Sequence, residues 1–209
     1  PHVVGDERFQ LVSGLAQRPH RRDDIRRQTG NLRRSWRLNR HWARKVNFSS
    51  NVTYLTNQSN LLDTRQWVFE ASDDLNSGDQ IRFQASRNFE RILATDDPFV
   101  LNPRKHIVVP AGDYDFNRWL VEYKSFDGRA IVPGIRLERG EFYGGSRTTV
   151  GLSGIWRPSP HLVLQGNYDY NDVSLPQGKF NAHLVRARFT VPITARASVD
   201  AFIQRNGLN

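Results

Sequence analysis

Apolar and polar residues alternate along most of this chain. The segment from Thr149 to Val173 shows the pattern twice, with a Pro-Ser-Pro break between the two runs. One side of the two runs carries Val150, Leu152, Trp156, Leu162, Leu164, Tyr168 and Tyr170. A period of two places these side chains on one face of each strand, so the segment predicts a β-hairpin. Whether that apolar face meets a protein core or lipid decides the class of function.

The same period recurs from end to end, and no apolar stripe of helical period persists beyond two turns. We therefore predict an all-β chain, arranged as an antiparallel up-and-down meander. The expected strands lie at about 8–16, 31–38, 46–56, 66–73, 79–89, 114–125, 130–139, 146–156, 162–170, 182–190 and 197–205.

In the clearest strands, charged residues fall on the side opposite the apolar one. These residues are Arg82, Arg118, Glu122, Arg186, Arg188 and Asp200. If the sheet lies in a membrane, an arginine on the lipid face near the midplane costs about 2–4 kcal/mol. Exposing Val185, Ala187 and Phe189 to lipid has no comparable cost. The alternation then predicts an apolar exterior and a polar interior.

The expected lengths of strands and connections favour an outer-membrane-type β-barrel. A strand such as 114–125 is long enough for the crossing of about 9–11 residues that a tilted membrane strand makes. The connections 90–113 and 171–181 are longer than 74–78 and 126–129, as in barrels with long loops on one rim and short turns on the other. We expect residues 1–209 to form one β-barrel domain, an incomplete barrel of about 10–12 strands.

The composition excludes some classes of site and of membrane segment. The chain has 209 residues and no cysteine or methionine, and it begins with proline. Without cysteine there is no thiolate zinc site. No apolar run is long enough for a transmembrane helix. We expect the chain to be a piece of a longer protein, with any export signal upstream.

Positive charge is concentrated near the N-terminus. The formal net charge is +9, and 11 of the 28 residues from Arg18 to Lys45 are Lys or Arg. Trp36 and Trp42 in this stretch would offer stacking partners for a nucleic acid. The arginines are spread over a loop, a strand and a turn, where they would equally line a polar lumen or meet lipopolysaccharide. Because positive charge alone supports only non-specific binding, a nucleic-acid partner is not expected.

Candidate catalytic and metal-binding groups are scattered. A cation site in the 90–113 loop and its exit would use Asp96, Asp97, Asp113 and Asp115, although turn chemistry explains these aspartates better. The six histidines have no close metal-ligand spacing. Ser153 lacks the glycine spacing of a nucleophile elbow. Glu138 and Glu141 would be a candidate carboxylate pair for glycoside hydrolysis, but nothing else in the sequence supports that chemistry. We expect no catalytic residue, no cofactor, no metal and no enzymatic activity.

Six aromatic residues are candidates for interfacial girdles, in which amphipathic rings lie at lipid headgroups. They are Trp67, Trp119, Tyr123, Trp156, Tyr168 and Tyr170. The alternative is that they are ordinary aromatic residues of a β core.

Several segments together resemble a known family. They are SGDQIRFQASRNFERI, HIVVPAGDYDFNRW, ASVDAFIQRN and the run from RGEFYGGSRTTV to AHLVRARF, and the likeness covers about residues 75–205. The chain resembles the C-terminal β-barrel region of DUF5916, a bacterial family of unknown function found with family-9-type carbohydrate-binding domains. The resemblance implies a barrel in the outer membrane with a glycan-binding domain upstream. This chain contains neither that upstream domain nor the closing strand that the resemblance implies.

The leading hypothesis is therefore a non-catalytic outer-membrane scaffold, pore or surface module. Its partners would be outer-membrane lipid and lipopolysaccharide, and a glycan through the upstream domain. Alternation is preserved when a sheet is turned inside out, so a soluble β-sandwich that binds a polyanion or a carbohydrate stays open as an alternative. A hydrolase, the third hypothesis, lacks a catalytic constellation.

Overall fold

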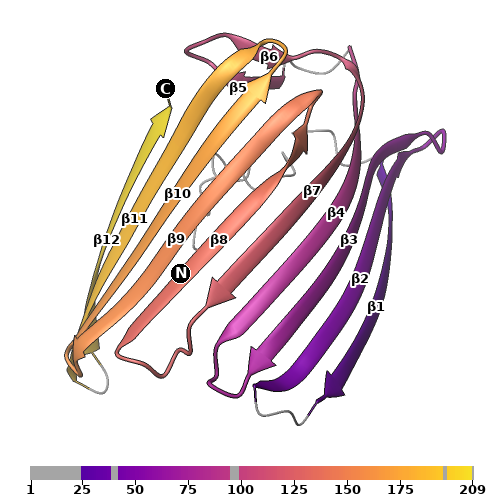
Figure 1. The fold of residues 1–209 in the computed structure, drawn as a ribbon. Coiled ribbons are helices and arrows are strands. Elements are labelled where there is room, and N and C mark those ends of the chain that lie inside the picture. The colour runs from indigo at the N-terminus through magenta and orange to yellow at the C-terminus, as the bar shows by residue number, and fades with distance from the viewer. Residues whose placement is uncertain (1–24, 39–41, 95–98, 195–196, 209) are drawn as a thin grey trace.

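The structure is a computed structural model, and it describes residues 25–38, 42–94, 99–194 and 197–208. Ten strands form one antiparallel sheet, in which neighbours in space are also neighbours along the chain except where a small hairpin intervenes (Figure 1). The strands are β1 (Ile25–Arg37), β2 (Ala43–Asn57), β3 (Leu62–Leu75), β4 (Gln80–Ile92), β7 (Gly112–Lys124), β8 (Ile131–Phe142), β9 (Gly145–Ser159), β10 (Leu162–Leu175), β11 (Gly178–Thr194) and β12 (Ala197–Leu208).

The all-β meander predicted from the alternation is confirmed. Ten of the expected strands each overlap one strand of the sheet, and the eleventh, 8–16, lies outside the described residues. The sequence prediction missed the hairpin of β5 (Phe99–Asn102) and β6 (Ile107–Val109) inside the expected 90–113 loop. Strands of four and three residues are too short to show a period of two.

The predicted contrast between long and short connections is wrong except at one place. The β4–β7 connection, which contains the hairpin, is long, but β8 to β9 and β10 to β11 are joined by two residues each. The strands are 12 to 17 residues long and take up most of the expected loops. Tyr143 and Gly144 between β8 and β9 have φ of 45° and 78°, the pair of positive values that a type I′ turn requires.

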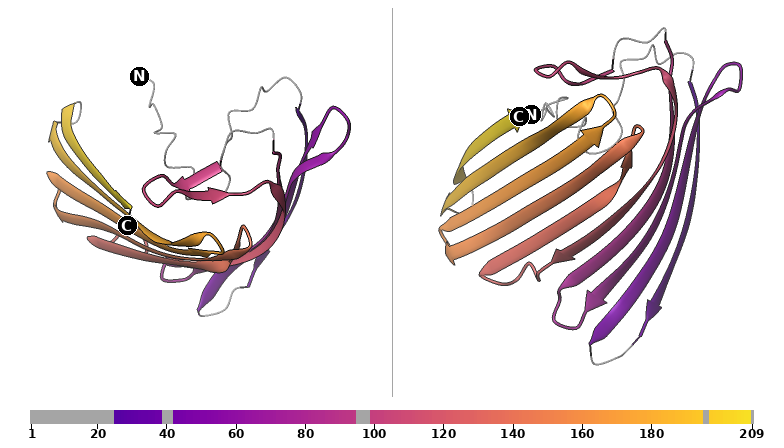
Figure 2. Two further views of the ribbon diagram at one scale, coloured as in Figure 1. Left: turned by 90° about the horizontal axis from the view of Figure 1, so that it is seen from above. Right: turned by 45° about the horizontal axis from the view of Figure 1, so that its top comes forward.

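The sheet is curved but open. Seen from above, it follows an arc, with the β5–β6 hairpin inside the curve (Figure 2). Within the described residues β1 and β12 are the two edges and do not pair with each other, so the sheet does not close into a barrel.

The main apolar core lies at one end of the concave face, beneath the hairpin. Ile107 and Val109 of β6 pack with Phe116 of β7, Phe142 of β8 and Phe180 of β11, and all five are buried. Tyr143 contacts several of these rings edge-on or tilted. The rest of the concave face has no comparable apolar core among the described residues.

Candidate functional site

The two faces of the sheet differ in chemistry. Residues that pair across an antiparallel ladder point to the same side, so the registers assign each side chain to a face. Large apolar side chains that are exposed on the convex face include Leu32, Trp36, Phe48, Trp67, Phe69, Ile81, Phe83, Trp119, Val121, Ile135, Leu137, Leu152, Trp156, Val185, Phe189, Val199 and Ile203. The apolar surface extends from β1 to β12, whereas water-soluble monomers rarely expose patches beyond a few hundred Å².

Several charged groups on the convex face lie near the strand ends on the side of the hairpin. Asp115 lies 3.4 Å from Arg65 and 3.5 Å from Arg87, and Arg91 pairs with Asp113 at 2.7 Å. These exposed pairs border the apolar surface, whereas Arg34 of β1 and Arg205 of β12 lie within it on the two edge strands.

Ion pairs across neighbouring strands line the concave face. Arg82 lies 2.6 Å from Glu122 and 3.6 Å from Glu70. Asp169 lies 2.8 Å from Arg186 and 3.8 Å from Arg136. The predicted set of Arg82, Arg118, Glu122, Arg186, Arg188 and Asp200 does share one face, and it is the concave one. These pairs appear only when the strand register is known, which is why sequence reasoning did not find them.

A buried triad lies where the concave face meets the apolar core. Glu138 accepts hydrogen bonds from Arg147 at 2.5 Å and from Arg118 at 3.4 Å. The side chains are 13%, 3% and 9% exposed, respectively. Both guanidinium groups also lie over the Phe142 ring, at 5.5 Å for Arg118 and 5.1 Å for Arg147. Two buried cations thus share one carboxylate.

A polar pocket of about 260 Å³ opens on the concave side of β1, β2 and β3. It is lined by Asn31, Arg33, Asn47, Ser49, Asn51, Glu70 and Ser72. The Asn31 and Asn51 amides are hydrogen-bonded, and Ser35 donates to Asn47 at 2.7 Å nearby. Amides and hydroxyls of this kind suit water or small polar solutes.

The hairpin is fixed to distant strands. Lys105 donates to the Lys179 carbonyl of β11 at 3.0 Å, and Arg104 donates to the Leu208 carbonyl of β12 at 2.9 Å. At its other side, Phe99 of β5 packs edge-on against the Tyr143 ring, with 5.3 Å between centroids, and the Tyr143 hydroxyl donates to the buried carboxylate of Glu90 in β4. The hairpin therefore crosses the concave face from β4 to β12.

Among the described residues, the structure does not bring the sequence candidates for metal binding or catalysis together. Asp96 and Asp97 lie outside the described residues, and Asp113 and Asp115 are paired with arginines. Within the described part of the chain, no group of three His, Asp or Glu residues could hold a metal. Glu138 and Glu141 lie three positions apart on one strand and so face opposite sides of the sheet. Glu141 accepts a hydrogen bond from the Asn117 amide N–H.

The described arginines of the arginine-rich stretch are divided between the two faces of the sheet. In β1 the register places Arg27, Arg33 and Arg37 on the concave face, while Arg26 and Arg34 lie on the convex face. Residues 18–24 and 39–41 lie outside the described part. The six aromatic residues predicted as girdles all lie on the convex face, but at different heights along the strands.

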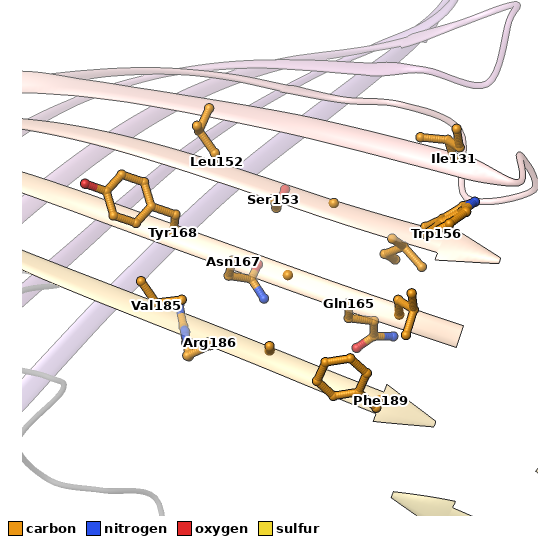
Figure 3. A pocket seen from close by; sticks show the side chains of 15 residues that line it. Ile131, Leu152, Ser153, Trp156, Gln165, Asn167, Tyr168, Val185, Arg186 and Phe189 are labelled. Atoms are coloured by element: carbon orange, nitrogen blue, oxygen red, sulfur yellow. The ribbon is translucent and has the colours of Figure 1, made fainter. Parts of the chain in front are cut away.

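The convex face is also hollowed at one place. An apolar trough of about 530 Å³ crosses β9, β10 and β11, and Figure 3 shows the side chains around it. Nothing in the sequence prediction identified it.

Comparisons with models of protein families, with curated proteins and with solved structures give no match for this chain. The described residues contain no helix that is long and apolar enough to cross a membrane.

Proposed function

We propose that this chain is a wall segment of an outer-membrane β-barrel, with its convex face against lipid and its concave face lining a polar interior. The observation that carries the proposal is the separation of chemistry between the faces. Exposed apolar side chains occupy most of the convex side of the sheet, where the ion pairs of Asp113 and Asp115 lie near the hairpin rim, and cross-strand ion pairs line the concave side.

Solvation energies favour placing the convex face against lipid and the concave face against water. In lipid, exposed apolar side chains have no cost, and an inward-facing arginine keeps its water and its carboxylate partners. In β3, β4 and β7 to β12, apolar runs on the convex face extend from five residues, as at Trp119–Tyr123, to nine residues, as at Leu162–Tyr170, whereas Arg34 in β1 and Ser50 in β2 interrupt theirs. The longest run reaches the length of about nine residues needed to cross a bilayer at a tilt.

The soluble alternative has less support. A β-sandwich packs two sheets of similar extent face to face, about 10 Å apart. The described residues form one ten-stranded sheet and one two-stranded hairpin, and the hairpin lies on the polar side. The apolar side has no covering layer among the described residues.

The resemblance to DUF5916 supports the same location and adds a role. We infer a passive scaffold, pore or surface module, without catalysis, which serves glycan capture by an upstream carbohydrate-binding domain. This part of the proposal rests on the resemblance alone.

The test is fractionation of the full-length parent protein. It should sediment with outer membranes, need detergent for release, and migrate differently on a gel before and after heating, because closed barrels resist unfolding in cold detergent. Recovery of a folded parent in the supernatant after membranes are pelleted, without detergent, would refute the membrane location.

A further inference from the structure

The polar pocket on the concave side of β1, β2 and β3 is a depression over one small side chain. Ser49 of β2 lies at its centre, with Arg33 as its direct partner on β1 and Glu70 as its direct partner on β3. Asn47 and Asn51 lie two residues away along β2 and share the face of Ser49. Because serine is smaller than all four of these neighbours, a space of about 260 Å³ remains between them.

The two ends of the pocket are held by hydrogen bonds between strands. At one end the Asn31 amide donates to the Asn51 side-chain oxygen. At the other end the Ser35 hydroxyl donates to Asn47 at 2.7 Å, and the Asn47 amide donates to Ser72 at 3.5 Å. These bonds position the amides without a ligand, as in the pre-formed pockets that bind small molecules.

Arg33, on one wall of the pocket, has no counterion in the described part of the chain. No carboxylate lies within 4 Å of its guanidinium group among those residues, and residues 25–62 contain no Asp or Glu at all. Glu70 lies two strands away, and two strand spacings put their Cα atoms about 9.6 Å apart. The charge of Arg33 is therefore available to an anionic group that enters the pocket.

The opposite wall has an excess of negative charge. Glu70 and Glu122 share Arg82, which lies 3.6 Å from Glu70 and 2.6 Å from Glu122. Two carboxylates and one guanidinium group leave a net charge of −1, and the shorter contact belongs to Glu122. Because the Glu70 side chain is 31% exposed and lines the pocket, it can accept hydrogen bonds from a cation there.

Opposite charges on opposite walls favour a ligand that carries both signs. A carboxylate would accept charge-assisted hydrogen bonds from Arg33, and an ammonium group would donate them to Glu70. A dipeptide with free ends is about 7 Å long when extended, which fits between strands about 9.6 Å apart. Its peptide group would meet the amides at the ends of the pocket. The lining residues include no aromatic ring on which a nucleobase could stack.

We propose that this pocket binds a short peptide with free termini, of dipeptide size, with its carboxylate at Arg33 and its ammonium group at Glu70. The inference goes beyond the proposed membrane function and does not require it, because every residue of the pocket lies on the concave face. If the sheet lines a pore, the peptide binds to the wall of the aqueous path.

Calorimetric titration of the purified full-length parent in detergent with L-alanyl-L-alanine tests the proposal. Three further probes are matched to it: the N-acetyl dipeptide lacks the ammonium group, the dipeptide amide lacks the carboxylate, and glucose is neutral. Loss of one charge-assisted hydrogen bond should weaken each blocked dipeptide about tenfold, and glucose should not bind. If the parent proves soluble, the titration needs no detergent, so failure of the membrane proposal leaves this test intact.

Substitutions assign each charge of the ligand to its wall. Arg33→Gln should weaken the dipeptide about tenfold and make it equal to its amide, whereas Glu70→Gln should make it equal to its N-acetyl form. Ser49→Asn fills the centre of the pocket and should abolish binding. Arg188→Gln removes a cation of the concave face in β11, far from the pocket, and should leave every affinity unchanged. Thermal unfolding of each variant checks that the fold is retained.

Equal affinity for the dipeptide and both blocked forms, or affinity that survives the substitutions at Arg33 and Glu70, overturns the site. An N-acetyl form that binds as tightly as the free dipeptide would show a site for anions alone. Binding of glucose with equal affinity would show a site for neutral solutes. Loss of affinity in Arg188→Gln would show that the charge of the whole face acts, and a folded wild type that binds none of the probes also refutes the proposal.

Discussion

Arg129 donates to both carboxylate oxygens of Asp79, at 2.6 Å and 3.4 Å, and so joins two turns that lie 50 residues apart in the chain. The Phe126 backbone N–H donates to the same carboxylate at 2.9 Å. Asp79 thus connects the β3–β4 turn to the β7–β8 turn at the rim opposite the hairpin.

The stability contributed by Asp79 should be lost in acid. The hydrogen bond from the Phe126 N–H, aided by Arg129 and Ser77, lowers the pKa of Asp79 from 3.8 to about 2. Because the folded pKa lies below the unfolded value, the contribution is fully present above about pH 4 and disappears as the pH falls towards 2. Thermal unfolding in detergent should show wild type above Asp79→Asn at pH 5, with the gap closing by pH 2.

Asp127→Asn is the matched control, since Asp127 pairs only with the nearby Lys124 among the described residues, in an exposed ion pair. Such pairs contribute about 0–1 kcal/mol. A gap between wild type and Asp79→Asn that stays constant from pH 5 to pH 2 would contradict the assignment.

Removing the carboxylate of the buried triad should be severe. Glu138→Gln leaves Arg118 and Arg147 buried without their shared counterion, and breaking a buried pair in this way costs about 3–5 kcal/mol. Glu141→Gln, on the opposite face of the same strand, should cost under about 1 kcal/mol. Urea unfolding of both variants in the same detergent measures the difference, and equal losses would refute the burial of the triad.

Two neighbouring substitutions test which face meets lipid. Ala187→Arg places a charge on the convex face and should cost about 2–4 kcal/mol in a bilayer, whereas Arg188→Ala on the concave face should be tolerated. The readout is the fraction of the full-length parent that assembles into the heat-modifiable form in vesicles. If the two variants assemble to the same extent, the assigned facing is wrong.

The Tyr143 hydroxyl should help to hold the hairpin, because its bond to Glu90 fixes the Tyr143 ring against which Phe99 of β5 packs. Tyr143→Phe removes a donor to the buried Glu90 carboxylate and should cost about 1–3 kcal/mol. Tyr114→Phe is the matched control, because its hydroxyl donates to the Pro110 carbonyl in an exposed position. Amide hydrogen exchange in residues 99–109 should accelerate in the first variant and remain close to wild type in the second.

Strand positions and faces followed from the sequence because a period of two is a local property. Val185, Ala187 and Phe189 alternate with Arg186 and Arg188 whatever their neighbours are. The triad of Arg118, Glu138 and Arg147 could not be predicted, because it joins three strands whose relative register depends on turn lengths. The loop at 171–181 was predicted wrongly because strand pairing, like register, is not a local property. β10 continues through Asn171 to Leu175, although these residues lie beyond the predicted end of the strand at 170.

The sequence contains a sign of the apolar trough across β9, β10 and β11, although alternation alone does not reveal it. Gly154 and Gly166 stand at positions where the alternation calls for an outward apolar side chain. Their alignment depends on the turn between β9 and β10, which pairs them directly. A glycine that interrupts an apolar face therefore carries information only when the partner strand is known.

The hairpin makes the two ends of the concave face unequal. One end is crossed by β5 and β6, with Arg104 and Lys105 reaching the far strands, and the other ends in short turns. If the wall closes around a water-filled path, the hairpin narrows that path at one mouth and adds Arg104 and Lys105 there. Ionic current through such a path would rectify, and its direction would report the orientation of the protein in the membrane.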